Sequence, residues 1–110
     1  MVDILIQAHF NYRSGKLSGF ELKGHADAGE YGQDIVCSAV SVLAINTVNS
    51  LEKLAQSKPQ VLSDDENGGF LKVELSDDQV QLPNVQLLLQ SFELGLRDVA
   101  NSYGKYIKIK

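Results

Sequence analysis

The sequence of 110 residues contains one cysteine and two histidines. A lone cysteine cannot form an internal disulfide, which is typical of proteins in a reducing compartment, and it leaves one thiol for packing or for chemistry. We therefore expect a cytoplasmic protein. The single cysteine and the histidines His9 and His25 lack the spacing of zinc ligands, so no metal site or other cofactor is expected. His9 is predicted to be a solvent-facing strand residue.

Phosphate-binding motifs are also missing. Gly24, Gly29 and Gly32 are not part of a Gly-Lys-Ser/Thr loop, and their spacing does not match the dinucleotide fingerprint. The formal net charge is -4, and acids cluster at residues 64–66 and 77–78, so a phosphate backbone would be repelled. We expect no direct nucleic-acid binding, whereas a basic protein or peptide partner remains open.

No long hydrophobic run is evident. The first seven residues lack a basic region and contain an early acid, Asp3, so a secretory signal is not expected. The longest apolar-rich run, Ile35 to Val48, is interrupted by serines and Asn46 and falls short of the roughly 20 residues that a spanning helix needs. We therefore predict that the chain neither spans nor binds a membrane.

Residue alternation in the first quarter of the chain predicts a hairpin. Val2 to Phe10 and Leu17 to His25 both alternate apolar and polar residues, and turn-forming residues separate them. Residues 26–33 contain two glycines within four positions, which predicts an irregular loop. Asp34 is then in the position of a helix cap, and the apolar residues that follow predict a long buried helix to about Gln56.

The second half of the chain repeats this pattern. Residues 60–62 and 70–75 are predicted strands joined through Asn67-Gly68, a dipeptide favoured in tight hairpin turns. Asp77 or Asp78 is the expected cap of a second helix of about six turns, with Pro83 in its first turn. Residues 105–110 alternate isoleucine with lysine, which suits an edge strand.

The predicted order of elements is therefore ββαββαβ in one domain, residues 1–110. Five strands and two long helices favour an α+β fold, a two-layer sandwich with both helices packed on one face of a mostly antiparallel sheet.

Cys37 and His25 are the candidate reactive pair. If Asp34 caps the helix, Cys37 is its third residue, and its sulfur lies beside backbone N–H groups that have no partner within the helix. A helix N-terminus and a nearby imidazolium both lower the pKa of a thiol, to about 3.5 to 7.5 in known cases. The same N–H groups would stabilise an oxyanion, while His25 takes the thiol proton and later donates it to a leaving amine.

Each of these residues also has a structural interpretation. Cys37 could be a buried small hydrophobe, and His25 could simply end a strand at the surface. Asp34 could cap the helix or orient His25, and these roles conflict because a cap occupies the N–H groups needed for the oxyanion. Asp27 is the rival residue for orienting His25. Ser41, four residues after Cys37, could steady the site or pack the helix against the sheet.

The segment that carries both residues resembles the signature of the ribosomal-processing cysteine protease family, often called Prp. It reads Gly24-His25-Ala26-Asp27-Ala28-Gly29-Glu30-Tyr31-Gly32-Gln33-Asp34-Ile35-Val36-Cys37-Ser38-Ala39. The resemblance extends to chain length, element order and the acidic turn before Gly69. It implies a cysteine endopeptidase in which Cys37 is the nucleophile, His25 the general base and acid, and Asp34 a supporting acid.

Further expectations follow from the resemblance alone. The substrate would be a large-subunit ribosomal protein, which loses a short N-terminal extension by a cut beside aromatic residues, and the enzyme would be a homodimer. The loop that contains Gly29, Glu30, Tyr31 and Gly32 would be a lid over the site.

Two other classes of function remain open, namely a non-catalytic ribosome-assembly binding module and a redox-sensing thiol protein. A dimer surface could lie either on the small-residue face of the first long helix or on the C-terminal edge strand.

Overall fold

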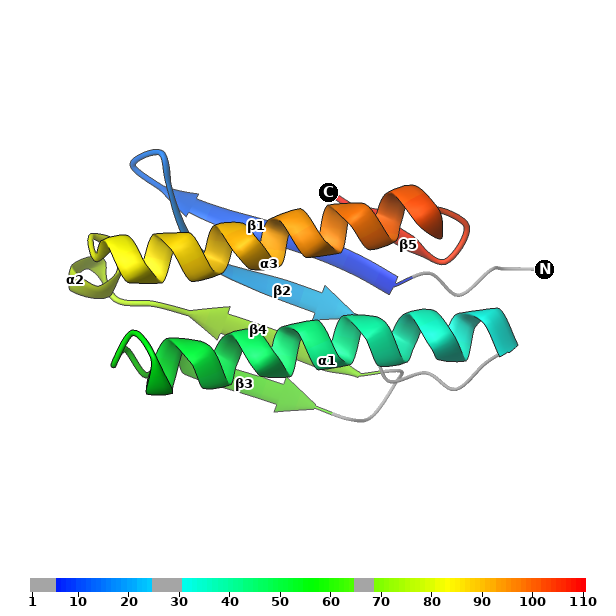
Figure 1. Cartoon of the computed structure of the whole chain (residues 1–110), viewed down its shortest axis with the longest axis horizontal. Helices are drawn as coiled ribbons and strands as arrows, with labels where there is room; N and C mark the ends of the chain where they lie inside the picture. The colour runs from blue at the N-terminus through cyan, green and yellow to red at the C-terminus, as the bar shows by residue number, and fades with distance from the viewer. Residues whose placement is uncertain (1–5, 25–30, 65–68) are drawn as a thin grey trace.

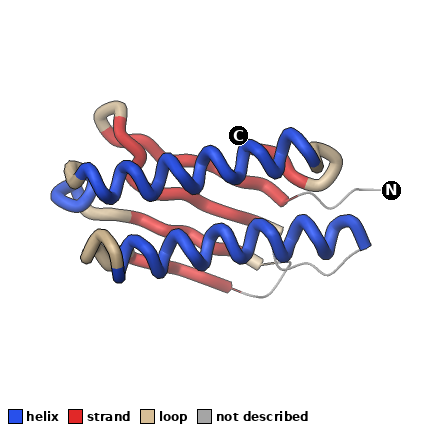
Figure 2. The backbone as a smooth tube through the Cα atoms, in the orientation of Figure 1, coloured by secondary structure: helices blue, strands red, loops and turns tan. Residues whose placement is uncertain are grey.

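The computed structural model describes residues 6–24, 31–64 and 69–110, with the backbone alone for residues 31–34. Their secondary structure is drawn in Figures 1 and 2. The elements are β1 (Ile6–Arg13), β2 (Lys16–Lys23), α1 (Tyr31–Lys53), β3 (Gln60–Asp64), β4 (Phe70–Glu74), α2 (Asp77–Val80), α3 (Pro83–Ser102) and β5 (Ile107–Ile109).

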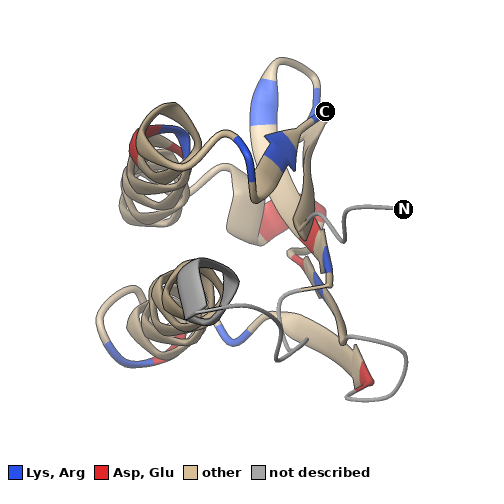
Figure 3. Cartoon of the chain, turned by 90° about the vertical axis from the view of Figure 1, so that its right-hand side faces the viewer, with Lys and Arg blue, Asp and Glu red and all other residues tan. Residues whose placement is uncertain are grey.

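The strands form one sheet in the order β3-β4-β2-β1-β5. All neighbours are antiparallel except β1 and β5, which are parallel. Both long helices cover the same face of this sheet, as the end view in Figure 3 shows, with α1 over the β3–β4 side and α3 over the β1 side (Figure 1). The predicted two-layer α+β sandwich is confirmed, and β5 lies at an edge as its lysines suggested.

The core lies between the sheet and the helices because alternate strand residues point inward. Ile6, Ala8 and Phe10 of β1 are buried, as are Phe20 and Leu22 of β2. The ring of Phe92 from α3 packs on two of these residues, with centroids 4.3 Å from Phe20 and 5.8 Å from Phe10. This aromatic cluster joins α3 to the centre of the sheet.

A bulge in β2 sets the position of α3. The register shifts so that Asn11 faces Gly19 whereas Tyr12 faces Leu17, which turns Leu17 into the core. The Gln86 side chain makes two hydrogen bonds with the backbone of Leu17. It accepts from the N–H of Leu17 at 3.1 Å and donates to the carbonyl of Leu17 at 2.7 Å. A side chain of α3 thus takes the place of a neighbouring strand at this point.

The predicted start of the first helix is wrong. α1 begins at Tyr31, so Asp34 is its fourth residue and not its cap, and the predicted loop over residues 26–33 extends too far. A glycine at position 32 costs a helix only about 1 kcal/mol relative to alanine, and tertiary packing supplies most helical stability. Packing along a 23-residue helix therefore outweighs the local preference of this glycine for a loop.

The second helical region differs from the prediction at its start. Ser76 caps a separate short helix, α2, in a reciprocal capping box with Gln79, so Asp77 and Asp78 are first-turn residues and not caps. Pro83 then opens α3, as expected for a proline in a first turn. The predicted turn dipeptide Asn67-Gly68 lies outside the described residues.

α1 is more apolar than the sequence interpretation assumed. Its segment Ile35–Lys53 has a mean hydropathy of 1.4, which is enough in length and composition for a membrane span, although the core helix of a soluble protein meets the same criterion. The prediction that the apolar run is too short is therefore wrong. Val36, Val40, Ala44 and Leu51 are buried in the core, yet only 33% of the segment is buried. Much of its surface is thus uncharged and exposed.

Candidate active site

Cys37 lies in the second turn of α1, on the side that packs against the sheet. Its side chain is 7% exposed and belongs to the hydrophobic core, as do those of Val36 and Val40. Its sulfur lies 3.7 Å from the carbonyl oxygen of Gly24, to which the thiol donates a hydrogen bond. The thiol is therefore buried but held by a polar partner.

Gly24 joins three segments of the chain at this point. It follows the last residue of β2, and its N–H donates to the carbonyl of Gly69, just before β4, at 2.9 Å. Its φ is +83°, a left-handed conformation that residues with a side chain rarely adopt. The glycine therefore lets the chain turn so that its N–H meets the start of β4 and its carbonyl meets α1.

His25 lies outside the described residues, as do Asp27, Gly29 and Glu30. The carbonyl oxygen that accepts from Cys37 belongs to Gly24, the residue that precedes His25 in the sequence. This role of Gly24 was not predicted from the sequence, where its only signal was a glycine at a strand end.

The predicted position of Cys37 at the third residue of the helix is wrong. Because α1 starts at Tyr31, Cys37 is the seventh residue, and its N–H has an acceptor within the helix. The electrostatic effect of a helix end falls off within the first turn. Stabilisation of a thiolate by free N–H groups of α1 is thus not available in this arrangement.

The other predicted site residues lie on α1. Asp34 is one turn before Cys37, and Ser41 is half-buried one turn after it. Tyr31 and Gly32, predicted to be part of the lid, are instead the first two residues of the helix. The i, i+3 and i, i+4 spacings put positions 34, 37 and 41 on one side of α1.

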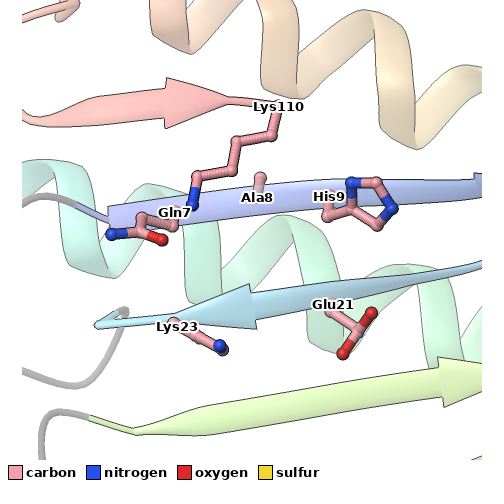
Figure 4. A pocket seen from close by; sticks show the side chains of 6 residues that line it. All are labelled: Gln7, Ala8, His9, Glu21, Lys23 and Lys110. Atoms are coloured by element: carbon pink, nitrogen blue, oxygen red, sulfur yellow. The ribbon is translucent and has the colours of Figure 1, made fainter.

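A separate hollow lies on the sheet face away from the helices (Figure 4). It is lined by Gln7, Ala8, His9, Glu21, Lys23 and Lys110 and has a volume of about 200 Å³. His9 is exposed there, which confirms the predicted solvent-facing position. In the described part of the chain, no three His, Cys, Asp or Glu side chains come together as metal ligands.

Comparison with known proteins shows which family the chain belongs to. Residues 5–108 match the family described as cysteine protease Prp. The chain belongs to this family. It is 33% identical over 97 residues to the ribosomal processing cysteine protease Prp of Staphylococcus aureus, which covers 86% of this chain and 87% of that protein. The chain is therefore a cysteine protease, and the interpretation of the protein as a non-catalytic module is not supported.

The fold of the chain is also similar to that of solved structures. SMU.848 from Streptococcus mutans has a TM-score of 0.91 and 42% identity, over 97% of this chain and 93% of that one. The essential ribosomal processing protease Prp from S. aureus, in complex with a substrate peptide, has a TM-score of 0.80 and 29% identity, over 96% of each chain. Another structure of the S. aureus protease contains a covalently linked product peptide.

Proposed function

We propose that this protease removes a short N-terminal extension from a large-subunit ribosomal protein and cuts beside aromatic residues. Its relatives are named ribosomal processing proteases, and the S. aureus enzyme has been solved with substrate and covalently linked product peptides. The observation that carries the assignment to this chain is the position of Cys37. It is the only cysteine, and its sulfur contacts the peptide group that precedes His25.

In the proposed mechanism, His25 takes the thiol proton of Cys37, and the sulfur attacks the carbonyl carbon of the scissile peptide bond. The carbon–nitrogen bond then breaks, and the imidazolium returns the proton to the leaving amine. Water activated by His25 hydrolyses the thioester and restores the thiol. A thiolate has no proton to donate, so the bond from Cys37 to Gly24 must break before attack.

The central experiment compares the wild type with Cys37→Ala and His25→Ala on a peptide that contains the ribosomal protein's N-terminal extension. His9→Ala is the matched control, because His9 is exposed on the opposite sheet face. Mass spectrometry should find one cut with the wild type and the control and none with the other two variants. Equal cutting by Cys37→Ala would refute the assignment. Replacing the aromatic residue at the cut with alanine should slow cleavage.

Asp34 and Asp27 are the two candidates for orienting His25. We expect only one of the variants Asp34→Asn and Asp27→Asn to shift the pH dependence of kcat/KM, because an orienting carboxylate stabilises the imidazolium. Ser41→Ala should change activity only if its hydroxyl steadies the site. The lid hypothesis predicts that Gly29→Val slows cleavage of the cognate peptide.

The protease is also proposed to form a homodimer through the outer face of its helix layer. Residues 35–51 of α1 and 83–92 of α3 contain no charged residue. Large apolar side chains are nevertheless exposed on these helices, namely Ile35, Val42 and Leu87 within the two stretches and Leu94 two residues beyond the second. A two-fold interface must match itself, and an uncharged apolar face does so without needing opposite charges.

Sedimentation equilibrium of a double variant, Val42→Glu with Leu94→Glu, tests this surface. The wild type should sediment as a dimer and the double variant as a monomer, whereas Leu54→Glu, at an exposed leucine beyond the end of α1, should stay dimeric. A monomeric wild type that floats with lipid vesicles would contradict both the dimer and the predicted absence of membrane binding. We place the enzyme in the cytoplasm, where its one thiol stays reduced, and cell fractionation tests this.

A further inference from the structure

The reactive side of α1 faces away from the other long helix. Leu43 of α1 points toward α3, where it lies against Gly95. At 100° per residue, Cys37, Ser41 and Val48 lie about 120°, 160° and 140° around the helix from Leu43. Figures 1 and 3 show that α3 covers the β1 side of the sheet. The helical rotation therefore puts these residues on the flank of α1 toward β3.

β3 is an edge strand with little protection. It is last in the strand order, and within the described residues no other strand pairs with its outer side. All five of its residues are exposed, including Val61 at 46% and Leu62 at 62%. The opposite edge, β5, is three residues long and is followed by Lys110. Natural edge strands are usually blunted by charged side chains, proline or shortness, and residues 60–63 of β3 contain neither a charge nor a proline.

The end of β3 is level with the active site. Asp64 of β3 pairs with Phe70, which pairs with Lys23, the residue before Gly24. A strand added beside β3 would lie three strand spacings from β2, or about 14 Å. About four or five extended residues cover that distance. One peptide is therefore long enough to pair with β3 and to reach Cys37.

A peptide strand paired with β3 would contact the protein on both of its faces. A hollow of about 550 Å³ flanks β3 on the sheet's outer face and is lined by Gln60, Val61, Leu62, Lys72 and Glu74. On the other face, the flank of α1 presents the half-buried Val48 and the exposed Ile45. The edge strand would supply main-chain hydrogen bonds, and these two surfaces would accept alternate side chains.

We propose that the peptide substrate binds as an additional strand along the free side of β3, with its scissile bond at Cys37. This rests on the proposed protease function and adds the surface that recognises the substrate. The peptide bound there is the stretch that adjoins the cleavage point, because only that stretch is near enough to Cys37. Strand pairing uses the peptide backbone, so it also explains how a small enzyme can hold a short, extended peptide segment.

Amide hydrogen exchange with the Cys37→Ala protein tests the surface directly. With the uncleaved peptide bound, the outward-pointing amides among residues 60–63 should exchange at least about ten-fold more slowly, because each gains an acceptor. The amides of Ile107–Ile109 at the other edge should not change. Slower exchange at β5 but not at β3 would overturn the proposal. The proposal would also be overturned if, without peptide, exchange at β3 became slower as the protein concentration rose.

Kinetics give the second measurement. Val61→Lys and Leu62→Lys place a blunting lysine on the strand and should raise KM about ten-fold while kcat stays within about two-fold. Leu54→Lys is the matched control, since Leu54 is 72% exposed and lies outside this surface. If the wild type cuts the peptide and both β3 variants have the same KM as the wild type, the strand-addition proposal is wrong but the proposed function is upheld. If the wild type does not cut, the proposed function itself fails.

Discussion

Gly24→Ala is the substitution that best separates the stability of this fold from the geometry of its active site. An L-residue in the left-handed region costs about 1 to 2 kcal/mol, so alanine at a φ of +83° should destabilise the protein by that amount. The chain can relieve this cost by turning the peptide group between Gly24 and His25. That turn would take the carbonyl away from Cys37 and shift the histidine.

A displacement of about 1 Å in a catalytic group can lower the rate about 100-fold. We therefore expect kcat/KM of Gly24→Ala to fall ten- to 100-fold, by about the same factor at each pH. The assay is cleavage of the ribosomal-protein peptide, and urea unfolding gives the stability of the same samples.

The matched control is Gly15→Ala in the β1–β2 turn. Gly15 has nearly the same conformation, with a φ of +81°, and a methyl group there would meet no atom within 4 Å. Both variants should lose about 1 to 2 kcal/mol of unfolding free energy, whereas only Gly24→Ala should lose activity. Equal kcat/KM in the two variants would show that the conformation of Gly24 does not position the site.

Three other predictions concern the fold. Gly19→Ala should destabilise the protein strongly, because a Cβ there would collide with the backbone carbonyl of Val73, and urea unfolding checks this. Phe92→Ala should lower the unfolding free energy by about 3 to 5 kcal/mol through loss of the aromatic cluster, while the melting curve stays cooperative. A hydrogen bond to Glu93 raises the pKa of Tyr12 above 10.0. The stability from this bond is therefore present below pH 10 and lost above the folded pKa. Glu93→Gln should lower the pKa of Tyr12 in an absorbance titration, with Tyr12→Phe as the control.

The sequence predicted the elements better than their arrangement. Alternation identified the strands because one sheet face is buried, and lysines at the C-terminus identified an edge strand. The strand order, with β5 parallel to β1, was not predictable from the same pattern. Burial of alternate residues requires only that a strand lie in the sheet, and it does not specify which strands are neighbours.

Helix starts were the least predictable feature. Asp34 and Asp77 are favourable cap residues, yet both are inside helices, because an acid is also favourable in the first turn. The true cap of α2, Ser76, was present as a Ser-x-x-Gln box and could have been recognised. The start of α1 had no such sequence signal. Gly32 favours a loop locally, and only the packing of the whole helix outweighs that preference.

Residue types and the family resemblance singled out Cys37 and His25 as candidates, but the contact between Cys37 and Gly24 was not predictable. The 3.7 Å separation depends on how α1 crosses the end of β2, which is a property of packing and not of spacing along the chain. The thiol of Cys37 is thus a buried hydrogen-bond donor. From the sequence, the sulfur was expected beside unpaired N–H groups at a helix end.

That difference changes where the oxyanion can be stabilised. The N–H groups of α1 without an acceptor in the helix belong to residues 31–34, which lie about 4.5 to 9 Å along the axis from Cys37. An oxyanion-hole donor must lie within about 3.1 Å of the oxygen. Side chains on a helix point back toward its N-terminus, so the first-turn groups nearest Cys37 lie on the side to which its sulfur points. The predicted conflict, in which Asp34 as cap would occupy the oxyanion donors, does not arise, because Asp34 is inside the helix. If the first turn supplies the donors, amide exchange at residues 31–34 should slow in the peptide complex of Cys37→Ala, and if another segment supplies them it should not change.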